Sequence, residues 1–341
     1  MVTWSEWPLQ DQGQKWDETM LTASDQSVFQ SYRWGEHKRQ HGWVPLRLAA
    51  RDKNGRLLAM AQLLAKHYAF GTCVCWVPGG PVLGFSSDIQ RLSDIVVDLR
   101  RLLQQRFRLA YVRLQPNTLR SAPRVYEMLR AGFRRPPARL STSFTVINRM
   151  GLSTSDLLAN MTSKHRYYTK KARTAGLNWE VSSSAGAIHA LAQLNMEVAR
   201  RTRVGWMASS EQTVQHLSLA MQDQSFILTG RSGANPVCSC LTLLSGSRAF
   251  YMMAGANAAG RILSASYAMF EQLAFVLESR GITELDFGGI DPKTPGAQGV
   301  NHFKLGFGGE IAEHLGEWEW FNSRLLGSAV NIAVGRTMRR S

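Results

Sequence analysis

The sequence predicts a mixed α/β protein made of two domains that share one plan. The chain has 341 residues, which is enough for two domains of ordinary size. Hydrophobic residues make up 44% of it and charged residues 19%, a composition that excludes a disordered protein and allows two sizeable cores. In addition, the order strand, strand, loop, helix, strand occurs once in each half of the chain.

In the first half, this order follows a turn at Asn54-Gly55. Strands are predicted over 57–64 and 73–77, and a Pro/Gly loop comes next. Asp88 is placed to cap a helix that precedes a strand over 110–114. The apolar face of this helix repeats at helical spacing and contains Ile89, Leu92, Ile95, Val96, Leu99, Leu102 and Leu103.

The second half repeats the plan with strands over 237–244 and 249–254, a loop over 255–260 and then a helix. Gly281 is predicted to end this helix, and a strand over 282–287 follows. The helix has an apolar face formed by Phe270, Leu273, Ala274 and Leu277. The repeated plan is the core of an α/β acyltransferase fold and suggests a tandem duplication, with domains over 1–150 and 151–341.

A glycine-rich segment follows the last of these strands and carries one lysine. Gly288-Gly289 comes directly after Phe287, and Lys304 lies between Phe303 and a second glycine cluster. Glycine pairs permit positive φ and a close approach to the backbone, and a fixed positive charge can stabilise the oxyanion formed in acyl transfer. The alternative is a glycine-rich turn with a solvated lysine.

The chain is strongly basic, with 40 Lys and Arg against 25 Asp and Glu and a net charge of +15. Such a charge indicates an anionic partner. The densest basic segment is a predicted helix over 163–173, with tyrosines between the charges, and Lys164, Arg166, Lys170 and Lys171 are its candidates for phosphate contacts. A solvated basic helix face is the alternative. We expect no DNA as a partner.

The cysteines form two Cys-x-Cys pairs, Cys73 with Cys75 and Cys238 with Cys240, each on one face of a predicted strand. Buried reduced thiols are favoured over a zinc site, and we expect neither a metal nor a cofactor. The N-terminus lacks the apolar core of a signal peptide, and no run is long enough to span a bilayer. We therefore expect a cytoplasmic protein.

The C-terminal segment predicts an amphipathic basic helix. Its apolar residues pair at helical spacing, and its basic residues are Arg324, Arg336, Arg339 and Arg340. Docking on its own domain is one use of such a stripe. The other use is peripheral contact with an anionic surface, here the inner face of the cell membrane.

Motifs spread along most of the chain resemble the Fem family of non-ribosomal peptidyltransferases. The closing pattern runs from Asp286-Phe287-Gly288-Gly289-Ile290 through Phe303-Lys304 to Leu315-Gly316-Glu317-Trp318. The other motifs are Gln30-Ser31 with Trp34 and Lys38, Pro78-Gly79-Gly80-Pro81, Ser163-Lys164-x-Arg166 and Arg203-Val204-Gly205-Trp206.

The resemblance implies two tandem GNAT-like domains, the first binding a precursor and the second carrying out acyl transfer. Their activity would add an amino acid from aminoacyl-tRNA to the stem-peptide amine of a peptidoglycan precursor, either UDP-MurNAc-pentapeptide or lipid II. By motif, Lys38 and Arg203 would contact the precursor's diphosphate, with Trp34 beside them, and Tyr251 would line the pocket. Phe303 and Lys304 would form the acyl-transfer site.

The sequence departs from the family in two places. Gln115-Pro116 replaces an Asp-Pro at a strand end of the first domain, and no heptad region long enough for a coiled-coil arm exists. Two other functions stay open. One is an acyl-CoA-dependent N-acyltransferase in which the loop 256–261 cradles pyrophosphate at a helix N-terminus, and the other is a non-catalytic binder of nucleic acid or membrane.

Overall fold

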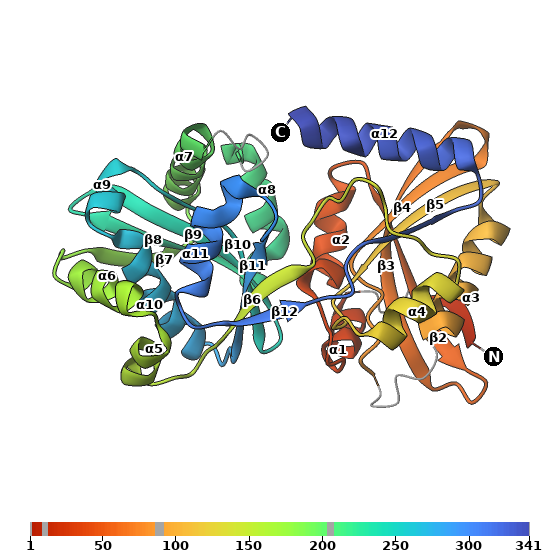
Figure 1. Ribbon diagram of the computed structural model, residues 1–341, viewed down its shortest axis with the longest axis horizontal. Helices are drawn as coiled ribbons and strands as arrows, with labels where there is room; N and C mark the ends of the chain where they lie inside the picture. The colour runs from red at the N-terminus through yellow and green to blue at the C-terminus, as the bar shows by residue number, and fades with distance from the viewer. Residues whose placement is uncertain (1, 9–12, 86–91, 203–207, 341) are drawn as a thin grey trace. The chain divides into compact units, whose positions relative to one another are not determined.

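The computed structural model describes residues 2–8, 13–85, 92–202 and 208–340. It divides into two compact units. The first contains Met1–Ser143 together with Glu313–Arg340, and the second contains Phe144–Ala312. Each unit is built on one mixed β-sheet with helices on both faces (Figure 1).

The first unit has a six-stranded sheet. In spatial order its strands are β1 (Val2–Glu6), β2 (Val44–Asp52), β3 (Leu57–Tyr68), β4 (Thr72–Gly79), β5 (Leu109–Pro116) and β13 (Trp318–Phe321). The pair β4 and β5 is parallel and stays in register over its whole length, from Thr72 opposite Leu109 to Gly79 opposite Pro116. The other neighbours are antiparallel.

Alternation along β5 assigns the two faces of this sheet. Ala110, Val112 and Leu114 point into the main core of the unit, whereas Tyr111 and Arg113 point to the opposite face. The main core lies under α3 (Leu92–Arg106) and α4 (Ala122–Arg130), and the opposite face is covered by α12 (Arg324–Arg340). The remaining helices of the unit are α1 (Gln14–Leu21) and α2 (Tyr32–Arg39).

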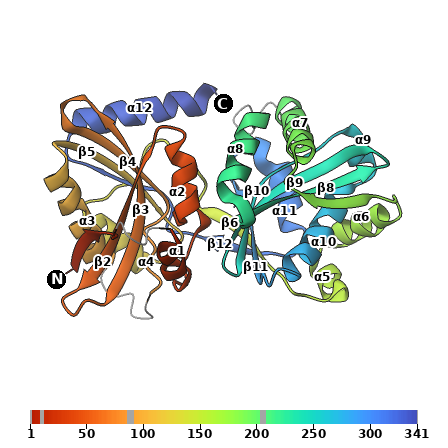
Figure 2. The same cartoon turned by 180° about the vertical axis from the view of Figure 1, so that it is seen from behind.

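The second unit has a seven-stranded sheet. In spatial order its strands are β12 (Glu310–Glu313), β6 (Phe144–Arg149), β11 (Glu284–Ile290), β10 (Arg248–Ala256), β9 (Asn235–Ser245), β8 (Ser225–Ser232) and β7 (Asn178–Ser182). The core on one face includes α10 (Ala265–Glu278) together with the buried thiols Cys238 and Cys240. On the other face α7 (Ala185–Thr202) packs on β8, β9 and β10 (Figure 2).

The other helices of the second unit are α5 (Thr154–Asn160), α6 (Ser163–Arg173), α8 (Glu211–Met221), α9 (Ala258–Ile262) and α11 (Gln298–Leu305). Several begin at a hydroxyl or amide cap that accepts a backbone N–H. Thr162 caps α6, Ser210 caps α8 and Asn257 caps α9. The six predicted strands of the repeat are all present. Each is longer than predicted by one to four residues at one or both ends. The start of β11 is the exception, because this strand begins at Glu284 and not at residue 282.

The expected domain boundary is corrected at the C-terminus. Residues 313–340 belong to the first unit and not to the second, because β13 pairs with β5 from Trp318 opposite Leu114 to Phe321 opposite Tyr111. The reason is burial: Trp318 and Trp320 enter the main core of the first unit, while Phe321 packs beside Tyr111 on the other face. The predicted amphipathic helix, α12, therefore docks on the first unit.

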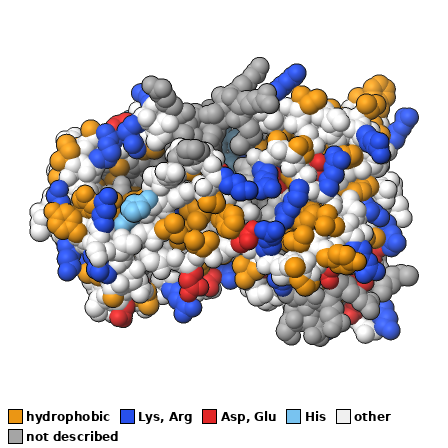
Figure 3. Space-filling view, viewed as in Figure 1, with side chains coloured by type: hydrophobic (Ala, Val, Ile, Leu, Met, Phe, Trp, Pro, Cys, Tyr) orange, Lys and Arg blue, Asp and Glu red, His pale blue; other side chains and the backbone are white. Residues whose placement is uncertain are grey.

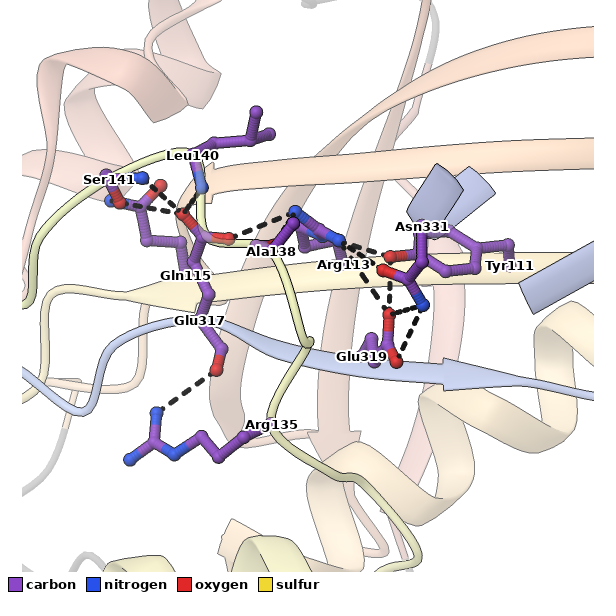
Figure 4. Close-up of polar contacts among 10 residues, drawn as sticks. All are labelled: Tyr111, Arg113, Gln115, Arg135, Ala138, Leu140, Ser141, Glu317, Glu319 and Asn331. Atoms are coloured by element: carbon purple, nitrogen blue, oxygen red, sulfur yellow. Dashed lines mark hydrogen bonds and ion pairs between the residues drawn. The ribbon is translucent and has the colours of Figure 1, made fainter. Parts of the chain in front are cut away.

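A buried polar network holds this returning segment in place (Figure 4). Arg113 lies 3.2 Å from Glu317 and donates to Asn331 of α12 at 3.0 Å, and Tyr111 donates to Glu319 at 2.7 Å. Asn331 in turn donates to both carboxylate oxygens of Glu319. Every ionised group here has partners, which is the condition under which buried charge is tolerated.

Candidate active site

The second sheet opens where β10 and β11 part. The two strands are parallel neighbours, but they pair only from Arg248 opposite Glu284 to Phe250 opposite Asp286. Beyond this point β10 has an irregularity between Tyr251 and Met253 on its β9 side, and β11 has one between Asp286 and Gly289 on its β6 side. Bulges of this kind turn backbone groups away from a ladder and commonly border functional sites.

Gly288 makes this opening possible. It has φ of +82°, a conformation that favours glycine, and a Cβ there would lie 3.2 Å from the Lys304 ammonium. Its backbone N–H donates to the Asp286 carboxylate at 2.9 Å, and Thr145 donates a hydroxyl hydrogen bond to the same carboxylate oxygen. The side chain that lies against this glycine pair is Lys304, and the close approach of a substrate to the same backbone stays a prediction.

Lys304 belongs to a helix rather than to the loop that we expected. It lies near the end of α11, whose Phe303 and Leu305 pack against the core of the second unit. The apolar contacts explain the difference, because they require this segment to keep a helical turn against the sheet. The loop before α11 is also fixed: Asn301 accepts from the Asp291 N–H at 3.0 Å and donates to its carbonyl at 2.7 Å.

The Lys304 ammonium is partly buried and donates to the Gly289 carbonyl at 2.9 Å. It forms no ion pair with any residue in the described part of the chain. Burial lowers the pKa of Lys304 to about 8, and the negative charge of Asp286 opposes part of this shift. The side chain therefore remains a cation at neutral pH, held beside a glycine backbone and close to its point of deprotonation.

Phe303, the residue before Lys304, belongs to a cluster of aromatic side chains. Phe303, Phe287 and Phe307 are in mutual ring contact, with centroids 5.0 to 5.9 Å apart, and Tyr251 contacts Phe287 at 4.7 Å. Burial raises the pKa of Tyr251 well above its ordinary value, so its hydroxyl stays protonated. The structure thus brings together three expected site residues, Tyr251, Phe303 and Lys304.

His165 connects α11 to the basic helix α6. Its two ring nitrogens lie 2.9 Å from the Thr162 hydroxyl and 3.0 Å from the Phe303 carbonyl. A side chain at Gly306 would collide with the imidazole, so the glycine makes room for it. Burial lowers the pKa of His165, which keeps the ring neutral. His165 therefore positions the turn that carries Lys304, a role that the sequence did not suggest.

The four basic residues expected on α6 separate into two kinds. Arg166 donates to the carbonyls of Ala159 and Met161, so it ties α6 to the end of α5. Lys164, Lys170 and Lys171 are exposed and form no ion pair within the described ranges. These three lysines are the more accessible candidates for phosphate contacts.

The loop expected to cradle pyrophosphate uses its own backbone donors. Asn257 accepts the Gly260 N–H at 2.9 Å through its side chain, and its carbonyl accepts the Arg261 N–H at 3.0 Å. The Arg261 guanidinium is directed to Glu197 and to the Ala256 carbonyl, each at 3.3 Å. The loop therefore caps a helix, and this geometry argues against a pyrophosphate site there.

In the first unit, the Gln30-Ser31 and Pro-Gly-Gly-Pro motifs pack on each other. Gln30 is fully buried and donates to the Pro78 carbonyl at 2.8 Å and to the Gln62 carbonyl at 3.2 Å. A side chain at Gly79 would collide with Ser27, and one at Gly80 would collide with Gln30. These contacts show that the two motifs together build the end of the sheet.

Lys38 lies on α2, beside this motif. Its ammonium is 4.5 Å from the centre of the Trp34 ring, and burial lowers its pKa. Its neighbours Arg39 and Arg47 are both engaged by Glu36, at 2.8 Å each, whereas Lys38 has no ion-pair partner among the described residues. Arg203, with the rest of the Arg-x-Gly-Trp motif, lies outside the described residues.

Gln115, which stands where the family shows an acid, donates to Ser141 at 2.8 Å. Ser141 in turn donates to the carboxylate of Glu317, which also accepts from the Leu140 N–H (Figure 4). Glu317 is only 3% exposed, so it does not replace the missing acid at a surface. Asp286 is the residue that sequence reasoning overlooked, although its place before a glycine pair was a signal.

Comparisons with known proteins agree with this architecture. The FemAB family model matches residues 207–334. The structure is similar to that of FemX, with a TM-score of 0.79 and 15% identity over 96% of this chain and 100% of FemX. It is also similar to a tandem GNAT protein from the clavulanic acid biosynthesis pathway, with a TM-score of 0.55 and 10% identity over 95% of this chain and 99% of that protein.

A conserved protein of unknown function from Bacteroides thetaiotaomicron gives a TM-score of 0.59 at 11% identity, over 94% of this chain and 99% of that one. No curated protein matches the sequence. The fold is that of two tandem GNAT-like domains, and these comparisons support an acyltransferase. The resemblance of this chain to the Fem family is thereby confirmed, in sequence over residues 207–334 and in fold over nearly the whole chain.

Proposed function

We propose that this protein is an aminoacyltransferase that adds an amino acid from aminoacyl-tRNA to the stem-peptide amine of a peptidoglycan precursor, either UDP-MurNAc-pentapeptide or lipid II. The observation that carries the proposal is the unpaired Lys304 ammonium beside Gly288 and Gly289, at the point where β10 and β11 part. The Fem-family match of residues 207–334, which include this site, supports it.

The chemistry requires a cation and no covalent intermediate on the enzyme. The acceptor amine attacks the ester carbonyl of the donor, a C–N bond forms, and the C–O bond to the tRNA ribose breaks. The amine proton leaves with the ribose oxygen. Lys304 would stabilise the negative oxygen of the tetrahedral intermediate, with Phe303 and Tyr251 lining the space around it.

The remaining basic residues fit the polyanionic substrates. Lys164, Lys170 and Lys171 present exposed charges on α6, in the unit that contains Lys304, and these would contact the tRNA backbone. Lys38, held on Trp34, would contact the diphosphate of the precursor, and Arg203 is assigned to the same group by its motif alone. Arg166 would be a weaker contact than the three lysines, because its Nη1 donates to the Ala159 and Met161 carbonyls.

The test is muropeptide mass analysis of the native host with the gene deleted and then restored as wild type, Lys304→Met or Lys293→Met. We expect a mass difference of one amino-acid residue that disappears on deletion, with about 10²–10³-fold less transfer by the Lys304→Met enzyme in vitro. Lys293 is an exposed lysine in the preceding loop, so Lys293→Met should behave as wild type.

Two outcomes would contradict the proposal. Identical muropeptide profiles with and without the gene would favour acyl-CoA chemistry on another amine, and titration calorimetry with CoA would then show binding. Full activity of a folded Lys304→Met enzyme would remove the role given to Lys304.

A further inference from the structure

Three segments of the first unit meet at the end of its sheet where β5 begins. They are the β3–β4 turn, the end of α3 with residues 107–109, and the start of α12. Thr72 pairs with Leu109, Asn322 donates to the Arg108 carbonyl at 3.0 Å, and the His67 and Phe107 rings are 5.6 Å apart. Both views show the turn beside the start of α12 (Figures 1 and 2).

The two most exposed large hydrophobic side chains described in the molecule lie here. Phe70, at the tip of the turn, is 83% exposed, and Leu325, at the start of α12, is 85% exposed. Phe70 also has φ of +59°, a left-handed conformation that is uncommon for a bulky residue. Neither side chain contributes to the packing of the core, because both point into solvent.

The outward face of α12 continues the apolar surface. Leu325, Ala329 and Ile332 follow at spacings of four and three residues, so they lie on one side of the helix, and Arg336 ends the same row. All four are exposed, whereas Gly327 and Asn331 on the other side contact Phe321 and the buried network. The helix thus has one face that packs on the sheet and a second apolar face that does not.

The charge around this surface has one sign. The segments 66–72, 104–109 and 324–340 contain no Asp or Glu, and their basic residues are Lys66, Arg106, Arg108, Arg324, Arg336, Arg339 and Arg340. Among those whose side chains the structure describes, which leaves out Arg339 and Arg340, Arg106 is the one that pairs with an acid, Glu6 of β1. Basic side chains also lie among hydrophobic ones over this part of the molecule in the space-filling view (Figure 3).

We propose that this surface, formed by Phe70, the outward face of α12 and the basic residues around them, docks on a phospholipid bilayer that carries anionic lipid. Protruding apolar side chains enter the headgroup region, and arginines beside them contact lipid phosphates. No helix in the described ranges is long and apolar enough to cross a membrane, so the contact is with the bilayer surface. This inference does not depend on the aminoacyl transfer proposed above.

The test is co-sedimentation of the full chain with vesicles of phosphatidylcholine, alone or mixed equally with phosphatidylglycerol. We expect binding to the mixed vesicles only, weakening with salt. Leu325→Glu combined with Phe70→Ser should weaken it at least about tenfold. The control Leu119→Glu changes another exposed leucine beyond the opposite end of β5, 56% exposed, and should leave binding unchanged.

A second pair of variants separates a defined surface from general basicity. Arg324→Gln with Arg336→Gln and Lys170→Gln with Lys171→Gln each remove two charges, and only the first pair lies on the proposed surface. Equal weakening by both pairs would overturn the proposal, as would binding that no variant changes. Sedimentation of the protein without vesicles measures its oligomeric state. If it were a dimer that Leu325→Glu abolishes, this face would be a self-association surface, and the proposal would be overturned.

Discussion

The two units contain the same parallel strand pair, closed in one and open in the other. In the first unit β4 and β5 stay paired to Gly79 and Pro116, and in the second β10 and β11 part after Phe250 and Asp286. Both pairs end near two adjacent glycines. In the first unit Gln30 and Ser27 fill the space beside the glycines, and in the second the Lys304 ammonium lies there.

Arg113 of the first unit and Lys304 of the second differ in how many partners their charges have. Arg113 of the first unit is buried with Glu317, Glu319 and Asn331. Its guanidinium forms ion pairs with both carboxylates and donates a hydrogen bond to Asn331. Lys304 has one carbonyl partner and forms no ion pair in the described part of the chain, and burial lowers its pKa, which the Asp286 charge partly opposes. Paired side chains therefore fill this region in the first unit, and a partly buried cation occupies the equivalent region of the second.

The largest expected effect tests the stabilising half of this comparison. Arg113→Met should destabilise the first unit by about 3–5 kcal/mol, because it leaves Glu317 buried without its cation and leaves Glu319 with Arg134 as its remaining cation. Thermal unfolding measures the loss. The matched change Arg101→Met removes a surface pair with Asp98 and should cost no more than about 1 kcal/mol. Similar losses for both would mean that the network is not a stability element.

Alanine at the two glycines should separate stability from activity. Gly79→Ala collides with Ser27 at φ of +66° and should cost about 2 kcal/mol, with near-normal specific activity of the folded protein. Gly288→Ala crowds Lys304 and should lower the transfer rate about tenfold. Gly55→Ala, at φ of +80° with no neighbour within 4 Å, gives the cost of the backbone conformation alone.

If Gly79→Ala instead lowered activity as strongly as Gly288→Ala, the two glycine regions would not differ in function. Rate and unfolding midpoint should therefore be measured on the same preparations of all three variants.

The pH dependence of the rate tests the state of Lys304. Its pKa is lowered to about 8, so the ammonium is present below that pH and is lost as the pH rises through it. Lys304→Arg keeps its charge, and the ratio of wild-type to variant kcat/KM should fall about tenfold for each pH unit above 8. Taking the ratio removes the titration of the acceptor amine. A constant ratio would show that the charge is not required.

The smallest effect concerns His165, which links α6 to α11 in the second unit. Because burial lowers the pKa of His165, the unfolded chain takes up this proton first as the pH falls. Stability should therefore be lost below the ordinary histidine pKa of about 6.5. His165→Gln should reduce the pH dependence of the unfolding midpoint between pH 7 and pH 5, whereas His67→Gln, at an exposed histidine of the first unit, should leave it unchanged.

The sequence by itself determined the α/β class, the repeated order of elements and the motif residues, because hydrophobic periodicity and turn residues act over a few neighbours. The resemblance to the Fem family, rather than any local pattern, is what predicts a site with Phe303, Lys304 and Tyr251. Sequence patterns misassigned the C-terminal segment, since the pairing of β13 with β5 joins residues about 200 positions apart.

Only the tertiary structure decided which parallel pair closes and which opens. Both pairs follow the same order of elements and end near glycines, so local patterns cannot tell them apart. The difference arises from what packs beside each glycine pair: Gln30 from a distant helix in one unit, and Lys304 on a helix held by His165 in the other. Contacts between remote residues, which set both the space and the local dielectric, made one copy structural and the other a candidate for catalysis.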